Sequence, residues 1–135
     1  ESISGNLDAR PRGVETVLLV DDEVALLELA AESLQMLGYR VITAANGELA
    51  LSRLAEESAI DLLFSDVVMP GGINGFELAE QAVVLLPGLK VLVTSGYTEK
   101  AVIRNGQARF NANMLSKPYT QVELAYRMRE ALDDK

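Results

Sequence analysis

The sequence predicts an α/β domain built on a doubly wound, five-stranded parallel sheet. Three observations support this fold class. Short apolar runs recur five times along the chain, segments with helical character separate them, and 135 residues suffice for one compact domain but not for two of ordinary size. Apolar residues make up 49% of the chain, so it can bury a real core.

The five predicted strands are short apolar runs that lack polar alternation. This pattern is typical of strands covered on both faces, as in a parallel sheet between two layers of helices. The runs lie at residues 17–20, 39–43, 60–64 and 91–93, with a weaker fifth run at 112–115.

Five helices are expected between and after these strands. Three segments carry apolar residues at intervals of three and four, namely 27–37, 76–86 and 124–132. The segment 48–57 is helical by composition, and 98–108 is the weakest of the expected helices because it has few apolar anchors. Gly38 stands where a C-terminal cap belongs, and Pro87 stops the helix before it. Thr120 and Glu123 form a candidate N-terminal capping box for the final helix.

Composition excludes several classes of function. The chain has neither histidine nor cysteine, which excludes Ser-His-Asp and Cys-His catalysis, His or Cys zinc sites, disulfides and a phosphohistidine of its own. Its net charge of −8 argues against binding to nucleic acid or to an anionic membrane surface. The same charge is compatible with binding a cation.

The chain is expected to form one domain with a short extension. Residues 1–13 are polar and interrupted by glycine and proline, so they predict a linker or flexible tail before a folded domain at 14–135. No apolar run approaches the roughly 20 residues that a membrane span needs, and no signal peptide is visible. We therefore expect a cytoplasmic domain without membrane contact.

Polar side chains follow four of the five predicted strands. Asp21 and Asp22 follow the first strand, Asp66 the third, Ser95 the fourth and Lys117 the fifth. In a doubly wound sheet, ligands bind beyond the carboxyl ends of the strands. These five side chains are therefore expected to converge at one edge of the sheet.

Three clustered carboxylates are electrostatically costly. Two of them about 4 Å apart repel by about 4 kcal/mol at an effective dielectric near 20. Such a cluster raises its pKa values or recruits a cation, and an all-oxygen set of ligands suits Mg²⁺. Acids, a magnesium ion, a lysine and a hydroxyl together are typical of phosphoryl transfer, in which a carboxylate can serve as the nucleophile.

The stretches that carry these residues resemble the receiver domain of response regulators. They read VLLVDDE, LFSDVVMP, NGFEL, KVLVTSG and LSKP, in the family's order and at matching spacing over about residues 14–132. The loop GGINGFE, together with VLVTSGY, resembles the corresponding stretches of receivers attached to hybrid sensor histidine kinases. The resemblance implies the flavodoxin-like strand order 2-1-3-4-5, five helices and a cis peptide bond between Lys117 and Pro118.

The resemblance also implies a role for each site residue. Asp66 would accept the phosphoryl group, Lys117 would bind it and Ser95 would be the switch hydroxyl. Mg²⁺ would be held by Asp21, Asp22, Asp66 and the backbone carbonyl of Val68. The phosphoryl donor would be a histidine kinase or a histidine phosphotransfer protein.

Such a domain is no conventional turnover enzyme, because it catalyses its own phosphoryl transfer and slow autodephosphorylation. It could belong to a hybrid kinase, and its last helix could mediate a homodimer.

Two features depart from the family pattern. Met114 stands where receivers often carry a switching aromatic, for which Tyr119 or Phe110 could substitute. The loop after Met69 is one or two residues longer than in many receivers, and its glycines are expected to give it freedom.

The sequence disfavours two other functions. Phosphatases of the haloacid dehalogenase type need a second acid two residues after the nucleophile, where this chain has Val68. A flavin site would place hydroxyls and glycine after the first strand, where Asp21 and Asp22 repel phosphate. The remaining alternative is a silent receiver-like domain that binds proteins without being phosphorylated.

Overall fold

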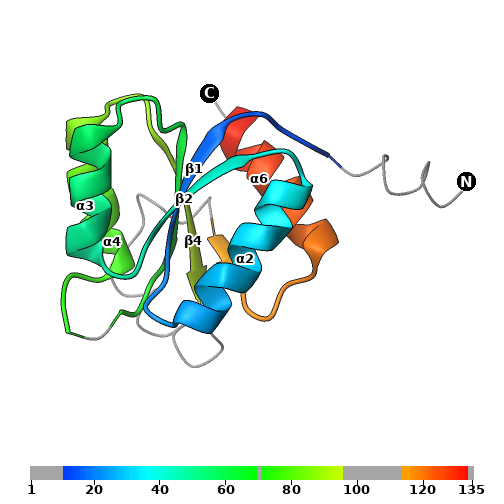
Figure 1. The fold of residues 1–135 in the computed structure, drawn as a ribbon, viewed down its shortest axis with the longest axis horizontal. Helices are drawn as coiled ribbons and strands as arrows, with labels where there is room; N and C mark the ends of the chain where they lie inside the picture. Colours follow the sequence, from blue (N-terminus) through cyan, green and yellow to red (C-terminus); the bar gives the residue numbers. More distant parts are fainter. Residues whose placement is uncertain (1–10, 70, 96–113, 134–135) are drawn as a thin grey trace, which may run out of the picture.

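A five-stranded parallel sheet forms the centre of the domain (Figure 1). The computed structural model describes residues 11–69, 71–95 and 114–133. The strands are β1 (Thr16–Val20), β2 (Arg40–Ala44), β3 (Leu62–Asp66), β4 (Lys90–Ser95) and β5 (Met114–Ser116). They pair in the order β2-β1-β3-β4-β5 with every pairing parallel, which confirms the predicted fold class.

Helices cover both faces of this sheet (Figure 1). The described helices are α2 (Val24–Met36), α3 (Gly47–Glu56), α4 (Gly75–Leu85) and α6 (Gln121–Asp133). They confirm four of the expected helices with shifts at the boundaries, and the fifth, expected at 98–108, lies outside the described residues. Within the described part of the chain, no helix is both long and apolar enough to cross a membrane.

The sheet separates two apolar cores. In β1, Leu18 and Val20 face the core shared with α3 and α4, whereas Val17 and Leu19 face the core shared with α2 and α6. Each of these four side chains is at most 4% exposed. A strand with helices on both sides has no solvent face, which explains why the sequence shows continuous apolar runs.

Glycine residues and capping hydrogen bonds define where the helices begin and end. Gly38, just after α2, adopts φ +103°, a conformation that glycine reaches at little cost. Before α6, the amide of Glu123 donates to Thr120 Oγ1 (3.0 Å) and the amide of Thr120 donates to Glu123 Oε1 (2.9 Å), as the sequence predicts. Helix α4 begins with the same reciprocal arrangement between Asn74 and Glu77.

Replacing Asn74 by alanine will lower the free energy of unfolding by about 1 kcal/mol, because the amide of Glu77 loses its acceptor. Urea denaturation measures the change. Asn74→Asp is the matched control, since it keeps a side-chain oxygen at the cap. An equal loss in the aspartate variant would show that the cap hydrogen bond is not the source of the stability.

Candidate functional site

Charged side chains lie at the carboxyl ends of three strands, at one edge of the sheet. The β1–β3 pairing aligns Val20 with Ser65, so Asp21 and Asp66 follow at the same level. The β4–β5 pairing aligns Ser95 with Ser116, so Lys117 follows one residue beyond that pair. The parallel register, with all strands ending together, explains why residues remote in sequence meet here.

The predicted acidic cluster is present. One carboxylate oxygen from each of Asp21, Asp22 and Asp66 lies within 4.8 Å of the others. Asp21 and Asp66 are buried, at 9% and 7% exposure, whereas Asp22 is exposed. Asp21 is held in place by the amide of Glu23, which donates to its Oδ1 at 3.0 Å. The cluster thus has two fixed, buried carboxylates and one at the solvent edge.

Lys117 supplies a positive charge to this cluster. Its Nζ lies 3.2 Å from Asp66 Oδ2 and 3.9 Å from Asp21 Oδ2. The peptide bond between Lys117 and Pro118 is cis, as expected. The amide of Lys117 donates to the carbonyl of Ser95 at 2.8 Å, which ties the lysine to the end of β4. Within the described part of the chain, this one ammonium group faces three carboxylates, which leaves an excess of negative charge.

The other two predicted site residues lie beside Asp66. Ser95 is the last residue of β4 and is buried. The preceding residue, Thr94, pairs with Asp66 in the sheet, and its carbonyl accepts the amide of Val67 at 2.9 Å. Val68 follows two residues after Asp66 and is 37% exposed. A backbone hydrogen bond therefore joins the segment that follows β3 to the end of β4, next to the cluster.

Tyr119 is a neighbour of the cluster that the motif analysis did not place there. Its ring packs against Phe64 with the centroids 6.3 Å apart and the planes tilted by 49°. Burial raises the pKa of Tyr119 to about 12, with smaller contributions from the negative charges of Asp21 and Asp66. The phenol therefore stays neutral at physiological pH. Met114 packs against the core on the α3 and α4 side.

A groove of about 560 Å³ opens beside the cluster. Leu26 and Leu29 of α2 line it together with Asp21, Lys117 and Tyr119. Both leucines are exposed, which gives one flank of the charged site an apolar wall. This groove could not be predicted from sequence patterns, because it is formed where α2 lies beside the segment that follows β5.

The oxygen atoms of the cluster fit a hard divalent cation. Mg²⁺ prefers carboxylate and carbonyl oxygens and is usually bound by one or two carboxylates with several waters. Asp21, Asp22 and Asp66 supply such oxygens, and the excess negative charge beside Lys117 favours a cation. The donor set holds no soft ligand for a transition metal, because the chain has neither cysteine nor histidine.

The strand order and the acids at the carboxyl edge define a doubly wound α/β domain of the CheY-like class. The chain belongs to the response regulator receiver domain family, which it matches over residues 17–129. It is therefore a receiver domain of two-component signalling, a class of domain that interacts with histidine kinases.

Curated relatives include both large and small proteins. The chain is 38% identical to the sensor kinase CckA of Brucella abortus over 122 residues, which is 90% of this chain but only 13% of that protein. It is 34% identical to the response regulator receiver protein CpdR of Brucella abortus over 106 residues, covering 78% of this chain and 87% of CpdR.

Solved structures show the same fold. The receiver domain of the hybrid histidine kinase CckA is 35% identical, with a TM-score of 0.71, covering 87% of this chain and 98% of that domain. The chemotaxis response regulator CheY4 of Vibrio cholerae is 28% identical, with a TM-score of 0.77, covering 89% of this chain and all of CheY4.

Proposed function

We propose that the domain accepts a phosphoryl group on Asp66 from a phosphohistidine and changes conformation in response. The observation that carries this proposal is the placement of Lys117 Nζ 3.2 Å from Asp66 Oδ2, within a cluster that includes Asp21 and Asp22. A buried carboxylate beside a fixed ammonium group provides both the nucleophile and a charge that stabilises the transferring group.

The step is a displacement at phosphorus. A carboxylate oxygen of Asp66 forms the new P–O bond while the P–N bond of the phosphohistidine breaks and the imidazole leaves. Lys117 neutralises charge on the phosphoryl oxygens, and the hydroxyl of Ser95 binds one of them after transfer. Mg²⁺, when held by Asp21, Asp22, Asp66 and the carbonyl of Val68, supplies further neutralisation of the developing charge.

The donor lies outside this sequence, because the chain contains no histidine. Hybrid kinases such as CckA, which carry a matching receiver, favour a histidine kinase or histidine phosphotransfer protein as the donor, acting from another domain or another protein. We place the domain in the cytoplasm on the same analogy. We also propose that α6 can mediate a homodimer.

Intact mass after incubation with acetyl phosphate and Mg²⁺ tests this function. We expect a gain of one phosphoryl group, lost in Asp66→Asn and in the absence of magnesium. Asp61→Asn is the matched control: Asp61 lies five residues earlier, its Oδ2 accepts the amide of Thr16, and an asparagine oxygen can replace it. This variant should be phosphorylated like the wild type.

Two results would contradict the proposal. If Asp66→Asn gains the phosphoryl group as readily as the wild type, another residue is the acceptor. If the wild type binds magnesium but gains nothing from acetyl phosphate or from a phosphorylated histidine phosphotransfer protein, the domain is a silent receiver-like interaction module.

A further inference from the structure

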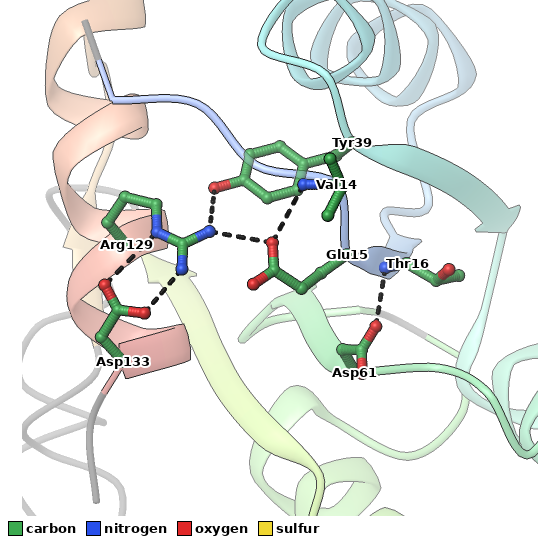
Figure 2. Close-up of polar contacts among 7 residues, drawn as sticks. All are labelled: Val14, Glu15, Thr16, Tyr39, Asp61, Arg129 and Asp133. Atoms are coloured by element: carbon green, nitrogen blue, oxygen red, sulfur yellow. Dashed lines mark hydrogen bonds and ion pairs between the residues drawn. The ribbon is translucent and has the colours of Figure 1, made fainter.

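A second polar cluster lies at the opposite edge of the sheet, where the strands begin (Figure 2). Glu15 precedes β1 and Tyr39 precedes β2, while Arg129 and Asp133 project from the last turns of α6. Because Asp66 and Lys117 stand at the carboxyl ends of the strands, this second cluster is separate from the candidate site.

Arg129 is the centre of this cluster. Its Nη1 donates to Glu15 Oε1 at 2.8 Å and to the hydroxyl of Tyr39 at 3.5 Å. Its Nη2 and Nε donate to the two carboxylate oxygens of Asp133 at 2.6 and 3.4 Å. One guanidinium group therefore joins α6 to the segment before β1 and to the start of β2.

The burial of this ion pair distinguishes it from an ordinary surface pair. The side chains of Arg129 and Glu15 are only 24% and 27% exposed. The hydrogen bonds that Arg129 donates to Asp133 and Glu15 raise the pKa of Arg129. Burial acts to raise the pKa of Glu15, but its contacts with Arg129 hold that pKa below the ordinary value. Arg129 binds Asp133 through two hydrogen bonds and Glu15 through one, and such a network of charges is a feature that lets an ion pair contribute to stability.

The segment held by Arg129 is attached to the domain mainly by polar contacts. We call residues 12–15 the N-terminal strap. The amide of Gly13 donates to the carbonyl of Leu37 at 3.0 Å, and the carbonyl of Glu15 accepts the amide of Arg40 at 3.0 Å. Gly13 lies so close to the ring of Tyr39 that a Cβ would collide with it. Val14 is 84% exposed, so the strap buries little apolar surface.

We propose that Arg129 is a clamp that holds the N-terminal strap against α6 and that the strap can open while the rest of the domain stays folded. The segment buries little apolar area and is fixed by a few polar contacts, which is typical of a unit that opens locally at low cost. In the clamped state, the strap has a position fixed relative to α6. Displacement of the last turn of α6 would release it.

Limited proteolysis with trypsin measures the opening of the strap, because the strap contains the Arg12–Gly13 peptide bond. When closing is fast, the cleavage rate reports the population of the open state. We expect Arg129→Gln to speed cleavage after Arg12 about tenfold, which corresponds to about 1.4 kcal/mol. Mass spectrometry follows the loss of residues 1–12 and the appearance of 13–135.

Arg127→Gln is the matched control. It removes a trypsin site from the same helix, and Arg127 pairs with Glu130, one turn away within α6, at 3.8 Å. Its cleavage after Arg12 should match that of the wild type. Glu15→Gln should reproduce part of the acceleration, because it removes the charge that Arg129 holds.

Cleavage elsewhere distinguishes release of the strap from general destabilisation. Arg53 lies within α3 and Lys90 within β4, so trypsin is expected to cleave after them only when these elements unfold. The clamp is supported if Arg129→Gln accelerates cleavage after Arg12 while the rates at these two sites stay unchanged. The proposal is overturned if the rate after Arg12 does not change, or if all three rates rise by the same factor.

Discussion

Replacing Asp21 and Asp22 together by asparagine will lower the affinity for Mg²⁺ by roughly a hundredfold or more, equivalent to about 3 kcal/mol. Both carboxylates lie within 4.8 Å of the carboxylate of Asp66. Their removal leaves one carboxylate beside Lys117, so the excess negative charge that favours a divalent cation disappears. Isothermal titration with magnesium chloride measures the loss directly.

The same double variant will be more stable than the wild type when magnesium is absent. Mutual repulsion of three carboxylates destabilises the folded domain, and removing two of them relieves it. Asparagine at position 21 retains an oxygen for the amide of Glu23. Added magnesium will then raise the urea midpoint of the wild type, because the ion binds the folded state, and will leave that of the variant unchanged.

The control removes the same number of charges from α2 without touching the cluster. Glu28→Gln combined with Glu32→Gln changes two exposed acids that are not members of it. This variant should retain both the magnesium affinity and the magnesium-dependent stabilisation. If the Asp21 and Asp22 variant is stabilised by magnesium as much as the control, the cation binds elsewhere and the assigned site is wrong.

Sequence patterns predicted the sheet and the acidic cluster because both depend on local signals. Apolar runs identified the strands, and the residues directly after them, such as Asp21 and Lys117, had to meet once the strands were parallel and in register. The capping box at Thr120 and the helix end at Gly38 could also be predicted, because each depends on residues only a few positions apart in the chain.

Contacts between segments that are distant in the chain could not be predicted from such local patterns. Glu15 and Arg129 are separated by 114 residues, and neither stands in a motif that signals the other. The position of Tyr119 against Phe64 likewise depends on how α6 and the preceding loop pack on β3. Such pairings are set by the packing of helices on the sheet, which periodicity does not specify.

Gly75 shows the same limit within the site itself. The sequence predicts that the glycines after Met69 give the loop conformational freedom, and Gly71 agrees with this, since its φ is +87°. Gly75 has a different role. It is the first residue of α4, it is buried, and its amide donates to the carbonyl of Val67 at 2.7 Å. A small residue is needed there because the backbone of Asp66 lies directly against it.

Replacing Gly75 by alanine will therefore destabilise the domain by about 2 kcal/mol, within the range for overpacking at a closely packed position. The added Cβ would collide with the carbonyl oxygen of Asp66 and stand 2.9 Å from the Cα of Val67. Both are backbone atoms and cannot rotate away, so either α4 or the end of β3 must move. Urea denaturation measures the loss of stability.

The functional consequence should be larger than the loss of stability alone implies, because the atoms displaced belong to the proposed phosphoacceptor. Gly88→Ala is the control: a Cβ at Gly88 meets nothing within 4 Å, and its φ lies outside the left-handed region, so stability should stay level or rise slightly. We assay Gly75→Ala well below the urea concentration of its unfolding midpoint. We expect its affinity for magnesium to be about tenfold lower, and its rate of phosphorylation by acetyl phosphate to be about tenfold slower. If the variant matches the wild type in both assays, the added Cβ displaces α4 and not the backbone of Asp66. The close packing at Gly75 would then support the fold without positioning the site.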